Sequence, residues 1–252
     1  MGIVKHSLIA VLISVTTLSG CVTLPGTNKK AFIMTSVAEE NKMGEEAYRQ
    51  ILATEKRSND ARINAMLKRV GERIAKQVPV EFQWEFTLIE SKEMNAFCLP
   101  GGRVAVYTGI LPITQDETGL AVVLSHEVAH ALARHGAERM STQMAASSLE
   151  QLAVGAGYIK SEAQLQVVQA VYGVGAALPH SRAQESEADH IGLILMAKAG
   201  YDPRQAVPFW QRMSGASGGK APPVFLSTHP SDTQRIERIQ SQLPEALTYY
   251  KQ

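Results

Sequence analysis

The chain has 252 residues, 45% of them hydrophobic, and it carries 25 Lys and Arg against 24 Asp and Glu. This length suits one globular domain with a short additional segment, and the hydrophobic fraction is ordinary for a folded protein. The net charge of +1 excludes both the basic excess of many nucleic-acid-binding proteins and the acidic excess of disordered tails.

The first twenty residues have the pattern of a secretory signal. Lys5 precedes the apolar run SLIAVLISVTTL, which is too short to span a bilayer. The run ends in Leu-Ser-Gly-Cys at residues 18–21, which resembles a bacterial lipobox with a lipidated cysteine. The alternative is an anchor helix with a chance cysteine, but the order of these features favours the signal. We predict a signal peptide at 1–20, a lipidated Cys21 with a linker at 21–35, and one folded domain at 36–252.

The residue after the cysteine bears on location. By resemblance to known lipoproteins, an aspartate there would favour the inner membrane, but this chain has Val22. The resemblance therefore implies the periplasmic side of a Gram-negative outer membrane, with the membrane as a partner through the lipid. Cys98 is the one other cysteine, so an acylated Cys21 leaves no intramolecular disulfide. We expect Cys98 to be a buried small hydrophobe.

The next part of the chain changes from helical to strand periodicity. Residues 36–78 have helical spacing, with a break near the sequence RSNDA. The sequence WEFTLIES, residues 84–91, alternates as a strand does. A Pro-Gly-Gly turn at 100–102 leads into a further alternating stretch. These patterns predict two helices and a small antiparallel sheet.

From Asp116 onward the pattern is helical. One helix is predicted from Asp116 to Gly136, where the glycine would form the C-cap. Another starts at Ser181 with a capping box to Gln184, and a last one starts near Ser231. The fold class is therefore α+β and mostly helical.

The sequence LSHEVAHALARHG, residues 124–136, carries the chemistry. His126 and His130 are four residues apart, so both lie on one face of a helix and can bind one metal ion, most simply zinc. Glu127 stands beside that ion, where a general base for a metal-activated water belongs. The alternative is a half-buried helix with two satisfied histidines. Burying these polar groups among apolar neighbours without a partner would be costly, which favours the metal.

A catalytic zinc needs a third protein ligand and an open fourth position. The sequence SRAQESEADHIG, residues 181–192, offers Glu185 and Asp189 on one helical face, whereas Glu187 points elsewhere. A carboxylate ligand on this face could be followed by Asp189, bonded to the far nitrogen of a ligand histidine. The alternative is an acidic helix start stabilised by the helix dipole. Because the His-Glu-x-x-His pattern already indicates a metal site, we favour a carboxylate metal ligand in this segment over an acidic helix start.

Four ordered segments resemble metallopeptidase family M48, which includes the CaaX prenyl protease and HtpX-type quality-control proteases. They are NAFCLPGGRVAVYTGIL at 95–111, HEVAH at 126–130, SRAQESEADHIG at 181–192 and THPSDTQRI at 228–236. The resemblance covers roughly 36–243 and implies that residues 36–252 form a zinc metallopeptidase domain of the zincin type. It implies one zinc, Glu185 as third ligand and the sheet beside the active-site helix. The chain is most similar to small periplasmic lipoprotein members. It lacks transmembrane spans and the helical repeats of the β-barrel assembly-enhancing protease.

Two further site predictions concern substrate and His229. An extended substrate is expected along Asn95, Ala96 and Phe97, adding to the sheet edge. His229, assigned as catalytic, could donate to the oxyanion, fill the fourth zinc position in a resting state, or bond to backbone at a helix entry. We expect His135, His180 and His190 to be surface or capping residues.

The function expected from these features is a zinc-dependent endopeptidase that degrades misfolded or misassembled cell-envelope proteins in the periplasm. Its partners would be those unfolded proteins, the membrane and the outer-membrane assembly machinery, and not nucleic acid. The alternative is a zinc-stabilised chaperone or assembly module that binds outer-membrane protein clients with little cleavage. The presence of Glu127 argues against it, because structural zinc needs no base.

Overall fold

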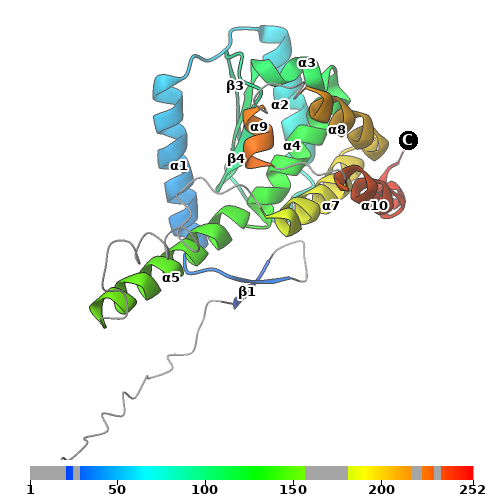
Figure 1. Ribbon diagram of the computed structural model, residues 1–252. Coiled ribbons are helices and arrows are strands. Elements are labelled where there is room, and N and C mark those ends of the chain that lie inside the picture. The colour runs from blue at the N-terminus through cyan, green and yellow to red at the C-terminus, as the bar shows by residue number, and fades with distance from the viewer. Residues whose placement is uncertain (1–20, 25–28, 157–180, 217–222, 230–233, 252) are drawn as a thin grey trace, which may run out of the picture.

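The structure is a computed structural model that describes residues 21–24, 29–156, 181–216, 223–229 and 234–251 (Figure 1). The predicted signal peptide and His180 lie outside these residues. Within the described residues, every helix is too short or too polar to cross a membrane.

The described helices agree with the mostly helical α+β fold predicted from the sequence. They are α1 Val37–Thr54, α2 Ala61–Ala75, α3 Leu111–Thr114, α4 Glu117–Leu132, α5 His135–Gly155, α7 Arg182–Lys198, α8 Ala206–Gly215, α9 Val224–Thr228 and α10 Arg235–Tyr249. Side-chain caps fix several starts: Ser36 and Ser181 form capping boxes, and Asp60 accepts a hydrogen bond from the Ile63 amide. The break between α1 and α2 and the start of α7 are confirmed.

The main sheet is mixed, so the expectation of an antiparallel sheet is correct for one pair of strands. Strands β3 Glu85–Ile89, β4 Ala96–Leu99 and β5 Arg103–Tyr107 lie in the order β3-β5-β4. β4 and β5 are antiparallel, joined by a turn in which Gly101 and Gly102 have φ of 83° and 86°. β3 and β5 are parallel. The hairpin folds back so that β5 lies between β3 and β4, and its direction then matches that of β3.

Helix α4 lies in the centre of the molecule. Every residue from Gly119 to Leu132 is buried. α4 packs against α2, α7 and strand β4 (Figure 1). Its N-cap, Asp116, accepts a hydrogen bond of 2.8 Å from the Gly119 amide. A helix that is apolar on all sides is stable only when it is enclosed in this way.

The end of α4 differs from the prediction. The helix ends at Leu132, and Gly136 lies inside α5 rather than at a C-cap. Arg134 adopts the left-handed conformation, with φ of 51°. Its guanidinium donates hydrogen bonds to Glu40 and to the Thr35 carbonyl, with Nε 3.0 Å from Glu40 Oε2 and Nη2 3.0 Å from the carbonyl oxygen. These bonds offset the conformational cost that a glycine would avoid.

Part of the segment expected to be a linker is paired. Strands β1 Cys21–Thr23 and β2 Lys30–Phe32 are antiparallel. Leu24, Ala31 and Ile33 are buried against Ala137 of α5. The segment from Cys21 to Ile33 is therefore packed onto the domain over its described residues.

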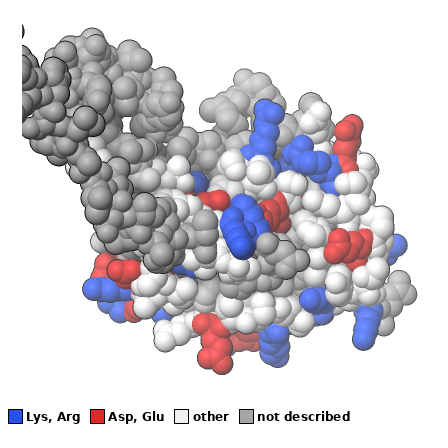
Figure 2. All heavy atoms as spheres, turned by 90° about the horizontal axis from the view of Figure 1, so that it is seen from below, with Lys and Arg blue, Asp and Glu red and all other residues white. Residues whose placement is uncertain are grey.

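Two features near the C-terminus differ from the prediction. Helix α9 precedes His229, and the last helix begins at Arg235 rather than near Ser231, which lies outside the described residues. The face seen from below carries acidic and basic side chains interspersed (Figure 2). This distribution agrees with the near-zero net charge.

Candidate metal centre

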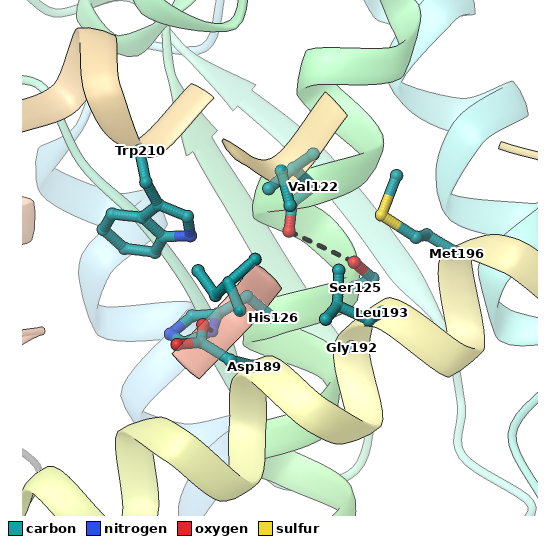
Figure 3. Close-up of a pocket in the computed structure, with 10 residues that line it drawn as sticks. Val122, Ser125, His126, Asp189, Gly192, Leu193, Met196 and Trp210 are labelled. Atoms are coloured by element: carbon teal, nitrogen blue, oxygen red, sulfur yellow. Dashed lines mark hydrogen bonds and ion pairs between the residues drawn. The ribbon is translucent and has the colours of Figure 1, made fainter. Parts of the chain in front are cut away.

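His126, His130 and Glu185 meet at one point. The Nε2 atoms of His126 and His130 are 3.1 Å apart on α4. Glu185, on α7, places Oε1 3.3 Å from His130 Nε2 and Oε2 3.4 Å from His126 Nε2. Gly192 allows α7 this close, because a Cβ there would lie 3.2 Å from the His126 amide nitrogen (Figure 3).

These three residues fit a zinc ion. Zinc binds histidine and carboxylate ligands at about 2.0–2.1 Å, and in a tetrahedral site two such ligands are about 3.3 Å apart. The separations of 3.1, 3.3 and 3.4 Å agree with this value. The charges of the centre also favour a cation. Three carboxylates, those of Glu127, Glu185 and Asp189, are buried there with one buried guanidinium, that of Arg235. A divalent cation would bring this sum to zero.

His229 lies at the fourth corner. Its Nδ1 is 3.3 Å from His126 Nε2 and 3.1 Å from Glu185 Oε1. The side chain follows α9 and stacks on Phe225 at 4.6 Å between ring centroids. His126, His130, Glu185 and His229 together could hold a metal ion, with ligand atoms within 4.8 Å of one another.

Glu127 has the surroundings of a general base. It is buried, and its Oε1 has no hydrogen-bond partner among the described residues. That oxygen lies 3.4 Å from His229 Nε2. Burial raises the pKa of Glu127, and the charges of His229 and His126 oppose this in part. A carboxylate with a raised pKa and a free oxygen can accept and return a proton.

Comparison with known proteins agrees with this centre. Residues 60–243 match the sequence model described as Peptidase family M48. The chain belongs to peptidase family M48. Since M48 metallopeptidases depend on zinc, zinc is the cofactor that both the family and the donor set indicate.

The relatives are metalloendopeptidases and assembly proteases. The chain is 38% identical to "Mitochondrial metalloendopeptidase OMA1" of Schizosaccharomyces pombe, over 88% of this chain and 66% of that protein. It is 32% identical to the human "Metalloendopeptidase OMA1, mitochondrial", over 80% and 40%. It is 27% identical to "Beta-barrel assembly-enhancing protease" of Escherichia coli, over 92% and 51%. The chain spans about half the length of the curated relatives it matches.

Asp189 and Arg235 contact His126 and Glu185 from behind the candidate metal centre. Asp189 Oδ1 lies 3.0 Å from His126 Nδ1, as the sequence analysis anticipated for a ligand histidine (Figure 3). Arg235 donates from Nε to Asp189 at 2.9 Å, and its Nη1 is 2.7 Å from Glu185 Oε2. Its guanidinium lies over the Trp210 ring at 3.4 Å. Burial opposes ionisation of Asp189, but Arg235 and His126 outweigh it and lower its pKa.

Arg235 was not assigned a role from the sequence. It belongs to the segment THPSDTQRI that resembles the M48 family, so the signal was present. The feature that marks Arg235 as functional is its complete burial. Burial depends on tertiary packing, so the sequence alone did not show it.

His135 was predicted to be a surface or capping residue, but it is buried and both its ring nitrogens contact other side chains. Its Nδ1 lies 2.8 Å from His130 Nδ1, and its Nε2 lies 3.3 Å from Glu187 Oε2. Lys29 in turn lies 3.1 Å from the same Glu187 oxygen. On a helix continued to Gly136, His135 would point away from His130; the turn at Arg134 reverses this. His190 is half-exposed beside Glu245, at 2.9 Å, in agreement with its prediction.

A cleft of about 350 Å³ lies between β4 and the metal centre. Asn95, Ala96 and Phe97 line it on one side and Glu127 and His130 on the other. β4 is an edge strand of the main sheet, so it can accept a further strand. Cys98 also lines the cleft and is half-buried rather than fully buried; burial raises the pKa of its thiol.

Proposed function

We propose that the chain is a zinc-dependent endopeptidase acting on misfolded or misassembled cell-envelope proteins. The observation that carries this is the buried Glu127 carboxylate, with an oxygen that lacks a hydrogen bond, beside His126, His130 and Glu185. Structural zinc sites have no use for such a group.

Each residue of the metal centre and the cleft has a separate role in this mechanism. His126, His130 and Glu185 hold the metal, and Asp189 orients His126 through its Nδ1. When held by these residues, zinc would supply an activated water and would polarise the scissile carbonyl. Glu127 Oε1 takes a proton from the attacking water and returns it to the leaving nitrogen. A substrate extended along Asn95, Ala96 and Phe97 pairs with the edge of β4, so recognition is mainly of backbone and suits unfolded chains.

The envelope location rests on the lipobox ending at Cys21 and on the likeness to a β-barrel assembly-enhancing protease. It implies anchoring on the periplasmic side of the Gram-negative outer membrane, with the assembly machinery nearby. Cell fractionation of the Cys21→Ser variant tests this. We expect the protein to leave the membrane fraction; retention there would refute the lipid anchor.

The first experiment compares casein cleavage by the zinc-loaded chain and by its Glu127→Gln variant. We expect the variant to bind zinc normally and to cleave about 10² to 10⁴ times more slowly, the range for loss of a general base. Full activity in the variant would show that Glu127 is not the base.

The second candidate function is a zinc-stabilised chaperone or assembly module that binds outer-membrane protein clients with little cleavage. His229 favours it, because its Nδ1 lies where a catalytic zinc needs an open position. If neither the chain nor Glu127→Gln cleaves casein but both bind zinc and unfolded client, this function replaces the first.

A further inference from the structure

The cleft beside the metal centre contains two arginines in different situations. Arg134 lines the cleft but is already paired with Glu40, whose Oε2 lies 3.0 Å from its Nε. Arg139, one turn further along α5, lines the same cleft. It makes no hydrogen bond or ion pair with any residue that the structure describes. The cleft therefore contains a guanidinium that has no hydrogen-bonded or ion-paired partner among the described residues.

The partial burial of Arg139 makes the lack of a charged partner unusual. Arg139 is half-buried, and burial lowers its pKa while the charges of Glu185 and Glu127 act in the opposite direction. An arginine remains charged near neutral pH even so. Placing a cation in a partly desolvated cleft without a partner is costly, and such sites usually bind an anion.

The carboxylates of the metal centre do not serve as that anion. Glu127, Glu185 and Asp189 contribute three negative charges, and Arg235 offsets one of them. The divalent ion that these residues fit offsets the other two. With the metal in place, Arg139 is in excess, and it lines the same cleft as Asn95, Ala96 and Phe97, along which the substrate is expected to lie.

We propose that Arg139 binds a carboxylate of the substrate close to the scissile bond, so that the enzyme prefers acidic peptides. This rests on the proposed peptidase function. The planar guanidinium binds a carboxylate through two parallel hydrogen bonds, which a backbone-reading strand cannot provide. The carboxylate can belong to an Asp or Glu side chain or to the C-terminus of the substrate.

Cleavage of matched peptides by the full, zinc-loaded chain tests this. One set has an amidated C-terminus and a single Glu or Gln moved through successive positions; a second set has Gln and a free C-terminal carboxylate. Mass spectrometry locates each cut. We expect the preferred carboxylate to raise kcat/KM about tenfold over its neutral counterpart, the usual effect of a hydrogen bond to a charged group. Preference within the amidated set identifies a side chain, and preference for the free acid identifies the C-terminus.

Variants assign the preference to Arg139. In Arg139→Gln the tenfold preference should disappear, and an unchanged circular-dichroism spectrum and Tm would show that the variant is folded. Arg139→Lys should retain part of the preference. The matched control is Arg62→Gln, an exposed arginine of α2 outside the cleft, which should keep all of it. Equal cleavage of acidic and neutral peptides by the parent chain, or a preference that survives Arg139→Gln, would overturn the proposal.

Binding separates this proposal from the peptidase function. In the Glu127→Gln background, anisotropy of labelled peptides should show about tenfold tighter binding of the acidic peptide, lost on adding Arg139→Gln. If the parent chain cleaves nothing but this difference is found, the peptidase function fails and Arg139 still recognises a carboxylate. If cleavage occurs without any Arg139-dependent difference in binding or rate, the peptidase function stands and this proposal fails.

Discussion

Replacing His229 tests most directly whether this side chain occupies the fourth ligand position of the metal centre. Its Nδ1 lies 3.1 Å from Glu185 Oε1, within the group of residues that could hold the metal. We expect His229→Ala to raise kcat/KM on casein, by about tenfold if the closed arrangement outnumbers the open one tenfold. A fall in kcat with zinc still bound would instead identify His229 as an oxyanion donor. An unchanged rate would leave it with the backbone contact that it makes to Phe225.

The residues that could be predicted are those whose spacing alone defines a shared face. His126 and His130 lie together because they are four apart on a helix, and Glu185 and Asp189 lie together for the same reason. His135 and Arg235 could not be assigned in this way. Their positions depend on a turn with a left-handed arginine and on the packing of α10 against α7, neither of which has a local sequence signal.

The turn between α4 and α5 links three helices at the centre. It directs His135 to His130 and, through Glu187, to α7. We expect His135→Ala to weaken zinc binding about 10- to 100-fold, as loss of a partner to a metal ligand commonly does. Competition with a fluorescent chelator measures this. His190→Ala is the control, because His190 pairs with Glu245 outside the centre. Equal zinc affinity in all three proteins would reduce His135 to a packing role.

Glu117, at the start of α4, should make the free energy of unfolding depend on pH. Glu117 accepts from Arg69 Nε at 3.2 Å and from the Tyr201 hydroxyl at 2.8 Å. The Arg69 bond is the main cause that lowers the pKa of Glu117 below 4.5. A lowered folded-state pKa contributes stability above the unfolded value and loses it as pH falls through the folded one.

Glu117→Gln should therefore lower the free energy of unfolding at pH 7 by less than about 1 kcal/mol, because the pair is partly exposed. Below pH 4.5 the difference from the parent chain should shrink. Urea titrations at pH 7 and pH 3.5 measure this, with the exposed Glu237→Gln as control. A difference that is constant with pH would show that the ion pair is not its source.

Elements were predicted where local chemistry defines them. Ser36, Asp60 and Ser181 cap helices that begin where expected. The parallel pairing of β3 with β5 was not predicted, because strand order depends on which strands share a buried face. Phe86 and Leu88 pair in register with Val104 and Val106, and this contact has no signal within either strand.

At the scale of the whole molecule, the fold encloses an excess of negative charge at its centre. Helices α4, α7 and α10 and the segment after α9 bring together Glu127, Glu185, Asp189, Arg235 and His229. Burying such a set is costly without a cation. The domain is thus organised around a metal, which agrees with its membership of peptidase family M48.

Dependence of proteolysis on zinc tests this account most directly. Casein cleavage is measured for the chain as purified, after removal of metal by a chelator, and after return of zinc in steps. We predict that cleavage is lost on removal and restored fully by about one equivalent of zinc per chain. Cleavage at an undiminished rate by the chain shown by metal analysis to be free of zinc would contradict the account.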